Sequence, residues 1–170
     1  RERRRAIITA PASVRSVGEA VMAADRLLET AKAQADAQVS ERNAREKAEL
    51  LRQLGMDEGE SATKASRTMI RQLEEDQKRR SKRALTDAID RALIDLLAIY
   101  RDVLMVQVGG DGELINTDLS DLVHEIAQDS TPRQTLARVD HIETARKRLV
   151  SNGNPLLVLE DMAISLRPQA

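Results

Sequence analysis

The fold is decided by one long stretch, Arg67 to Val108, which reads RTMIRQLEEDQKRRSKRALTDAIDRALIDLLAIYRDVLMVQV. Its second half carries large apolar residues at steps of three and four, the spacing of one face of an α-helix. These residues are Leu85, Ile89, Leu93, Leu96, Leu97, Tyr100 and Leu104. Further apolar residues widen this face over most of the circumference, which predicts a helix in the middle of a bundle.

The first half of this helix, from Arg67 to Arg83, is nearly all charged. Upstream, the region from Lys32 to Lys47 also contains almost no large apolar residue, and a loop with two glycines, Gly55 to Ser61, lies between the two regions. Two long helices that are both polar beside their connecting loop predict an antiparallel helical hairpin. Its polar tip, residues 32–66, is expected to project into solvent.

Signals for helix boundaries divide the rest of the chain. Residues 1–15 are expected to be the tail of a preceding segment followed by a linker, and residues 16–170 a helical domain. The central helix is expected to end at Gly109-Gly110, because glycine is the usual left-handed residue after a helix. In the connector that follows, Leu114 and Ile115 are expected to point inward.

Three shorter helices are predicted to complete the bundle. The first is expected to be capped by Thr117 or Asp118. The second starts at Thr131-Pro132-Arg133-Gln134, which combines a cap, a proline at the first helical position and a glutamine at the third. It stops at Asn152-Gly153, and Asn154-Pro155 starts the last helix. The predicted fold class is all-α, a helical bundle of about five main helices with a projecting antiparallel helical hairpin.

Composition limits the classes of function. The chain has 170 residues, a net charge of -1 and no cysteine. This charge predicts no general attraction to nucleic acid or to anionic membranes, and the lack of cysteine fits a cytoplasmic location. The most apolar segment, 92–108, contains three charged residues, so no membrane span is expected. The first residue is Arg1, and we expect a fragment of a larger protein.

Residues for catalysis are scarce. Asp121 and His124 have the spacing of half a di-iron site, but His141 has no matching carboxylate upstream, so no metal site is expected. The glycines from Gly109 to Gly112 lack the Gly-Lys-Ser/Thr ending of a phosphate loop. We therefore expect no catalytic residue, no cofactor-binding residue and no metal ligand.

The most basic run, Lys78 to Arg83, is one candidate for contact with nucleic acid. Three acidic residues, Glu74, Glu75 and Asp76, lie four positions before Lys78, Arg79 and Arg80, which favours ion pairs within the helix. No aromatic residue is nearby to stack on bases. The run is therefore predicted to be a solvated or subunit-facing surface.

Two segments resemble a known family. The run ARKRLVSNGNPLLVLE, residues 145–160, is similar to the C-terminal end of the delta-prime subunit of the bacterial DNA polymerase III clamp loader, where an Asn-x-Asn-Pro-x-x-x-x-Glu pattern joins the last two helices. Residues 75–96, followed by residues 100–104, look like delta-prime proteins of actinobacterial type. Gly153 stands where a small apolar residue is usual, and it is expected to loosen the turn between the helices.

The resemblance implies a scaffold role. In that family the C-terminal helical domains of several subunits form a collar, which holds AAA+ ATPase modules in a ring around primer-template DNA. Residues 1–15 would then be the tail of a AAA+ lid-like segment and a linker. The implied partners are the other clamp-loader subunits, delta and gamma/tau, with DNA contacted only indirectly. None of the family's catalytic motifs maps onto this chain. The expected interface residues are Tyr100, Arg146, Asn152, Asn154, Pro155 and Glu160.

Other functions remain open from the sequence. The main alternative is a self-contained helical adaptor or homo-oligomerisation domain unrelated to replication, in which the polar hairpin is the functional element. The helical domain of the ATPase loader subunit is a second, though it is less compatible with the pattern from Asn152 to Glu160. An enzyme is the weakest alternative.

Overall fold

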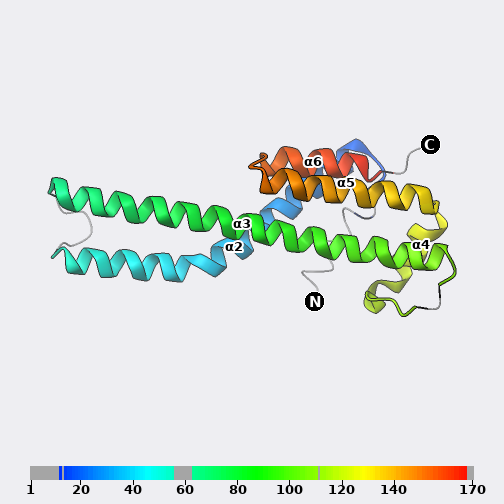
Figure 1. Cartoon of the computed structure of the whole chain (residues 1–170), viewed down its shortest axis with the longest axis horizontal. Coiled ribbons are helices and arrows are strands. Elements are labelled where there is room, and N and C mark those ends of the chain that lie inside the picture. The colour runs from blue at the N-terminus through cyan, green and yellow to red at the C-terminus, as the bar shows by residue number, and fades with distance from the viewer. Residues whose placement is uncertain (1–11, 13, 56–62, 111, 168–170) are drawn as a thin grey trace. The chain divides into compact units, whose positions relative to one another are not determined.

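The structure is a computed structural model that describes residues 12, 14–55, 63–110 and 112–167. Most of the predicted N-terminal tail and most of the predicted loop near Gly55 lie outside the described residues. The helices are α2 (Val17–Gln53), α3 (Lys64–Gln107), the short 3₁₀ helix η1 (Thr117–Leu119), α4 (Ser120–Gln128), α5 (Pro132–Val150) and α6 (Pro155–Ser165). The part of the chain that the structure describes contains no strand, and the all-α prediction is confirmed (Figure 1).

The chain divides into two compact units. The first, here called the bundle unit, comprises residues 1–31 and 89–170. The second, here called the hairpin unit, comprises residues 32–88. Both α2 and α3 contribute residues to each unit.

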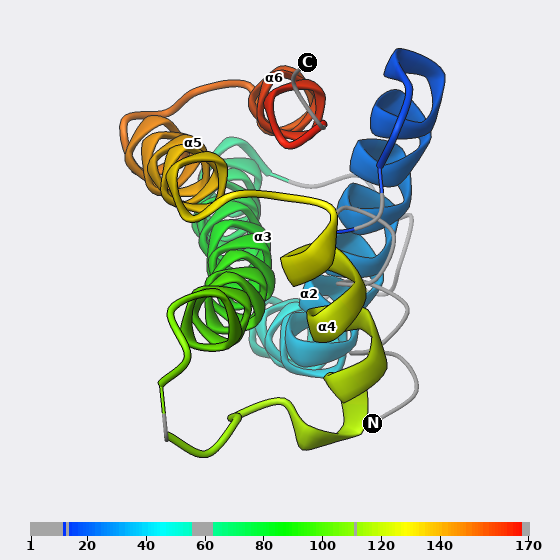
Figure 2. The same ribbon diagram turned by 90° about the vertical axis from the view of Figure 1, so that its right-hand side faces the viewer.

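The second half of α3 supplies the core of the bundle unit. Its residues Ile89, Leu93, Leu96, Ile99, Tyr100 and Val103 are at most 1% exposed. Helix α5 lies beside this part of α3 in both views (Figures 1 and 2), and buried Ile142 comes from α5. Burying each such aliphatic side chain contributes about 1.5–3 kcal/mol before the entropy of ordering is subtracted. The core therefore lies along the face that the sequence predicts.

The prediction that α3 is covered on most sides was wrong in part. Ile94 is 46% exposed, and Leu97 and Leu104 are only half-buried. The buried stripe also includes Ile99 and Val103, which lie four positions apart, while Leu97 and Leu104 lie at its edge. An apolar residue on a helix does not by itself say how many neighbours the helix has.

The predicted caps of α5 and α6 are confirmed. The Thr131 side chain accepts from the Gln134 amide at 3.3 Å, and the Gln134 side chain accepts from the Thr131 amide at 2.9 Å, so the two residues form a capping box. The Asn154 side chain accepts from the Leu157 amide at 3.3 Å, with Pro155 in the first turn.

The predicted end of α3 is confirmed, whereas the predicted start of α4 is not. Gly109 has φ +67° just after α3, as predicted. The predicted cap at Thr117 or Asp118 was wrong, because both residues lie inside η1, and α4 follows from Ser120 without a side-chain cap. Ile115 is 61% exposed and does not point inward.

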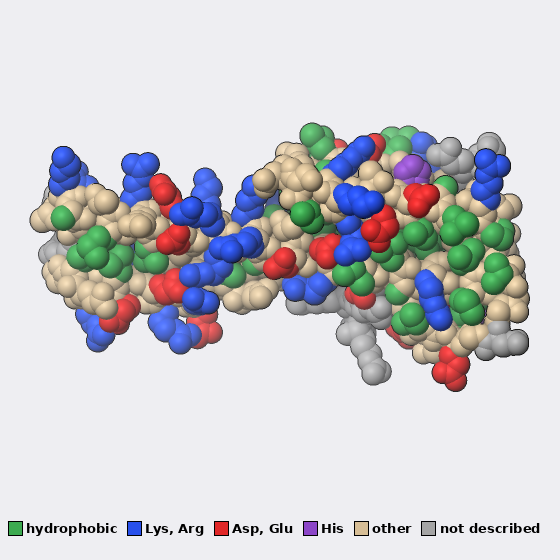
Figure 3. All heavy atoms as spheres, viewed as in Figure 1, with side chains coloured by type: hydrophobic (Ala, Val, Ile, Leu, Met, Phe, Trp, Pro, Cys, Tyr) green, Lys and Arg blue, Asp and Glu red, His purple; other side chains and the backbone are tan. Residues whose placement is uncertain are grey.

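In the hairpin unit the two helical segments run antiparallel and carry few large apolar contacts. Ala35 and Val39 of α2 pack on Ala84 of α3, with Leu85 beside them. Arg80 donates to Asn43 at 2.7 Å and to Glu46 at 2.9 Å, so polar contacts also join the helices. Lysine, arginine and acidic side chains are interleaved along this unit (Figure 3).

The ion pairs around the basic run differ from those predicted. Glu74 pairs with Lys47 of α2 at 3.4 Å, and Asp76 pairs with Arg79 at 2.9 Å. Arg80 pairs with Glu46, and the hydrogen bonds of Glu46 with Arg80 and then Arg42 lower its pKa to about 2. The acidic residues thus form ion pairs between α2 and α3 as well as within α3. The spacing along α3 alone does not reveal the ion pairs between the helices.

Candidate subunit interface

The segment from Arg146 to Glu160, here called the α5–α6 corner, contains five of the six predicted interface residues. A short turn joins α5 to α6, which runs back antiparallel along it (Figure 1). Arg148 of α5 pairs with Asp161 of α6 beside the turn, and because both side chains are more than half exposed, the pair orients the helices without adding much stability. The corner is therefore a supersecondary element with its own internal restraints.

The asparagine and proline residues of the corner shape the turn itself. Asn152 has φ +64°, a left-handed conformation that asparagine tolerates better than most residues. Asn154 caps α6, and Pro155 has no amide hydrogen to leave unpaired at the first helical position. The Asn-x-Asn-Pro pattern is thus explained by local folding. A role of these residues in contact with another subunit stays a prediction.

The prediction that Gly153 loosens the turn was wrong. A Cβ atom at this position would lie 2.8 Å from the backbone oxygen of Arg148 and 2.9 Å from Cγ2 of Val158. The Gly153 amide also donates to the Arg148 oxygen at 2.9 Å. Glycine therefore allows a close approach between the end of α5 and the start of α6, and the turn is tight.

Arg146 fixes the corner to the core helix of the bundle unit. Its Nε lies 2.7 Å from Oδ1 of Asp90, and Nη2 lies 3.2 Å from Oδ2, a two-pronged pair between α5 and α3. Nη1 also donates to Glu143 at 3.1 Å. The hydrogen bond with Asp90 is the main reason that the pKa of Arg146 is raised above its usual value. Arg146 is thus a positioning residue for the corner.

Tyr100, the sixth predicted residue, lies in the core and not at the corner. Its side chain is 0% exposed, and its hydroxyl has no hydrogen-bond partner among the described residues. The guanidinium carbon of Arg138 lies 5.9 Å from the ring centroid, within range of a cation–π contact. Burial raises the pKa of Tyr100 to about 12, although Arg138 opposes the shift. A side chain buried in this way offers no surface to another subunit.

Two exposed apolar side chains flank the turn of the corner. Val150, the last residue of α5, is 77% exposed, and Leu157, in the first turn of α6, is 64% exposed. Glu160 is half-buried on the same short helix. The helical periodicity of the sequence does not mark either apolar residue, because it marks the buried faces of the helices. The sequence signal that could have identified Val150 and Leu157 is that each is an apolar residue outside the buried face of its helix.

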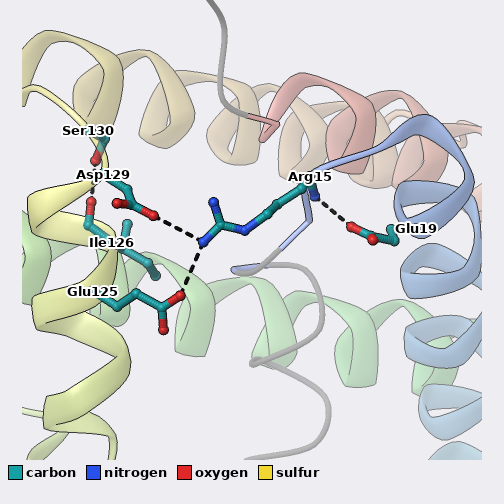
Figure 4. A network of polar contacts seen from close by, with 6 residues as sticks. All are labelled: Arg15, Glu19, Glu125, Ile126, Asp129 and Ser130. Carbon is teal, nitrogen blue, oxygen red and sulfur yellow. Dashed lines mark hydrogen bonds and ion pairs between the residues drawn. The ribbon is translucent and has the colours of Figure 1, made fainter.

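A surface network joins the N-terminal segment to α4 (Figure 4). The Arg15 guanidinium points between two carboxylates, 3.1 Å from Glu125 and 3.0 Å from Asp129, while its backbone amide donates to Glu19 at 2.8 Å. The pKa of Arg15 is raised, chiefly by its hydrogen bond with Asp129 and also by Glu125. All three side chains of the ion pairs are more than half exposed, so the network orients the segment without adding much stability.

Hydrogen bonds of Gln107 stabilise the C-terminal half of the bundle unit, and the sequence patterns do not single out this residue. Gln107, the last residue of α3, donates to the Ser130 oxygen at 2.7 Å and accepts from the Thr135 hydroxyl at 2.8 Å. It thereby ties the end of α3 to the connection between α4 and α5. No local motif marks Gln107, because its partners lie more than twenty positions away.

The described residues meet neither the requirements of a metal site nor those of a membrane span. No group of three or more histidine, cysteine or acidic residues among them is arranged to hold a metal ion. His124 and His141 are both exposed on their helices. Within the same described ranges, no helix combines the length and apolar character needed to cross a membrane.

Comparison with known proteins identifies a family for this architecture. A family model described as "DNA polymerase III, delta subunit, C terminal" matches residues 62–167. The DNA polymerase III subunit delta' of Bacillus subtilis (strain 168) is 36% identical over 72 residues, which are 42% of this chain and 22% of that protein. The chain thus spans about a fifth of the length of this relative, and no solved structure matches it.

The resemblance seen in the sequence is confirmed, while its actinobacterial type stays a prediction. Because the family model covers more than half of its residues, the chain belongs to the family of C-terminal domains of DNA polymerase III delta-type subunits.

Proposed function

We propose that this chain is a non-catalytic scaffold domain of a delta-prime subunit, and that it holds a clamp-loader ring together during DNA replication. The name of the Bacillus subtilis relative supports the assignment to delta-prime. The partners would be other clamp-loader subunits, delta and gamma/tau. The location would be the cytoplasm, and residues 1–15 would be the tail of a AAA+ lid-like segment and a linker.

The observation that carries this proposal is the exposed apolar pair Val150 and Leu157 on a restrained corner. Burial of such exposed apolar side chains against a partner protein would be favourable, because it removes apolar surface from water. The Arg146–Asp90 pair and the Asn154 cap already hold the corner in one conformation. A surface that is ordered before binding loses less conformational entropy on association, which favours a scaffold role.

The charges support indirect contact with DNA. The net charge of -1 gives no general attraction to phosphate backbones. In the basic run, Arg79 and Arg80 are engaged by Asp76 and Glu46. We therefore propose that the domain has no enzyme activity of its own, needs no cofactor and meets DNA only through its partners.

Gel filtration of the 170-residue chain mixed with the delta and gamma/tau subunits tests the proposal. Val150→Arg and Leu157→Arg place a charge where a partner would bury an apolar group, and each is expected to abolish co-elution. Met69→Arg is the matched control, since Met69 is also an exposed apolar residue, at 49%, but belongs to the hairpin unit. Absence of co-elution for the unchanged chain, or equal co-elution of all variants, would contradict the proposal.

One observation favours the alternative of a homo-oligomerisation or adaptor domain. The hairpin unit carries a hollow of about 580 Å³, lined by Leu50, Met69 and Leu73 among polar residues. An apolar groove of this size is able to accept a partner helix. Light scattering distinguishes the two functions: a stable homodimer that Met69→Arg dissociates and Leu157→Arg leaves intact would favour the alternative.

A further inference from the structure

A basic hollow of about 220 Å³ lies on α5 beside the end of α6. Arg133, Arg138 and His141 line it from α5, and Ser165 and Arg167 line it from the end of α6 and just beyond. No acidic residue is among the described residues that line it. The hollow is thus an electropositive concavity in a chain whose overall charge is close to neutral.

Arg138 forms the buried part of this hollow. The residue is only 7% exposed, and the contact that the described structure gives its guanidinium is the face of the Tyr100 ring. A buried charge without a hydrogen-bonded counter-charge is costly, and a cation–π contact compensates only in part. Arg138 therefore has unused hydrogen-bonding capacity beside the hollow, and none of its nitrogens is among the fully buried polar atoms of the described residues that lack a partner.

Two carboxylates that share a hollow with Arg138 do not supply a hydrogen-bonded partner for its guanidinium. Glu125 and Asp129 share with Arg138 the lining of a separate, smaller hollow of about 30 Å³. Both carboxylates bind Arg15, at 3.1 and 3.0 Å. They lower the net positive charge near Arg138 without forming a hydrogen bond with its guanidinium in the described structure.

Two further guanidinium groups face the same hollow. Nε of Arg167 donates to the Ile164 oxygen at 3.0 Å, which leaves its terminal nitrogens for other acceptors. Arg133 is exposed at the rim. Three like charges around one concavity repel one another, and an anion bound between them would relieve that repulsion.

We propose that this hollow is a binding site for a phosphate group with two negative charges, as in inorganic phosphate or a phosphate monoester. Three guanidinium groups and an imidazole present more donors than the two oxygens of one carboxylate need, whereas phosphate offers oxygens in several directions. A phosphodiester backbone carries one charge per phosphate, and no phenylalanine, tyrosine or tryptophan is among the described residues that line the hollow to stack a base. The proposal does not depend on the scaffold function.

Calorimetric titration of the 170-residue chain with inorganic phosphate, at pH 7.5 and constant ionic strength, tests the site. Arg138→Gln is expected to weaken phosphate binding by about tenfold or more, and Arg133→Gln and Arg167→Gln by at least about fivefold. Lys147→Gln is the matched control, since Lys147 is an exposed cation of α5 outside the hollow, and it should change binding by less than about twofold.

Arg133 and Arg167 keep the test decisive if Arg138→Gln does not fold, because both lie nearer the surface. Phosphate should also raise the melting temperature of the unchanged chain and of Lys147→Gln more than that of Arg133→Gln. Three results would overturn the proposal: no phosphate binding at millimolar concentration, equal binding by all variants, or binding of an unphosphorylated single-stranded oligonucleotide without binding of inorganic phosphate.

Discussion

The buried carboxylate of Asp102 accepts two hydrogen bonds from Asn116: its Oδ2 lies 2.7 Å from the backbone nitrogen of Asn116 and 2.9 Å from Nδ2. Its Oδ1 accepts from the Ile115 amide at 3.0 Å and from Arg101 at 2.7 Å. Asp102 and Asn116 are both 0% exposed. This relationship fixes the connector after α3 and so sets where η1 and α4 begin.

Asp102→Ala is therefore expected to lower the free energy of unfolding by about 3–5 kcal/mol, because it leaves buried donors without an acceptor. Asp140→Ala removes an exposed carboxylate of α5 and should change the same quantity by less than about 0.5 kcal/mol. Urea unfolding followed by circular dichroism measures both. Equal effects of the two changes would show that the connector is not held by Asp102.

The same carboxylate gives the stability a defined dependence on pH. Burial raises the pKa of Asp102, but the hydrogen bonds from Ile115, Asn116 and Arg101 together outweigh it and hold the pKa below its usual 3.8. A lowered pKa in the folded state contributes stability above the unfolded value, and that contribution is lost as pH falls through the folded value. The difference in unfolding free energy between the unchanged chain and Asp102→Asn should be full near pH 6 and shrink below about pH 4. A difference that stays constant down to pH 2 would contradict this.

Tyr100→Phe is expected to leave the free energy of unfolding unchanged or raise it by up to about 1 kcal/mol. The hydroxyl is buried without a partner among the described residues, so its removal eliminates a desolvated polar group while the ring stays in place. Tyr100→Ala, which also removes the ring, should cost about 3–5 kcal/mol. Thermal unfolding of the three proteins checks the order, and a Tyr100→Phe loss above about 2 kcal/mol would mean that the hydroxyl is bonded.

Gly153→Ala is expected to destabilise the protein by about 1–3 kcal/mol, because the added methyl group would contact the Arg148 backbone oxygen and Val158. Gly18→Ala is the control. Gly18 lies in α2 with nothing within 4 Å of an added Cβ, and alanine there should be neutral or stabilising by up to about 1 kcal/mol. Comparison of melting temperatures decides the matter. A stable Gly153→Ala protein would show that the turn is able to open.

Local features of the sequence predicted local structure well. The caps at Thr131 and Asn154 and the left-handed Gly109 depend on residues within a few positions of one another. All residues that form these features can therefore be read from a short stretch of sequence. The family resemblance rests on the same kind of information. The turn that carries its Asn-x-Asn-Pro pattern is built from neighbours in the chain.

The features that could not be predicted from the sequence depend on contacts between residues far apart in the chain. Asp102 reaches Asn116 across fourteen positions, and Gln107 reaches Thr135 across twenty-eight. No periodicity marks such partners, because their meeting depends on how the helices pack. The exposure of Val150 and Leu157 has the same origin, since only the packed bundle shows which apolar residues remain outside it.

Hydrogen exchange of the 170-residue chain, measured by mass spectrometry with and without the delta and gamma/tau subunits, tests the scaffold proposal most directly. The proposal predicts slower exchange in the α5–α6 corner, around Val150 and Leu157, when the partners are added, with no change in the hairpin unit. Unchanged exchange in the corner, or protection confined to the hairpin unit around Met69, would contradict it.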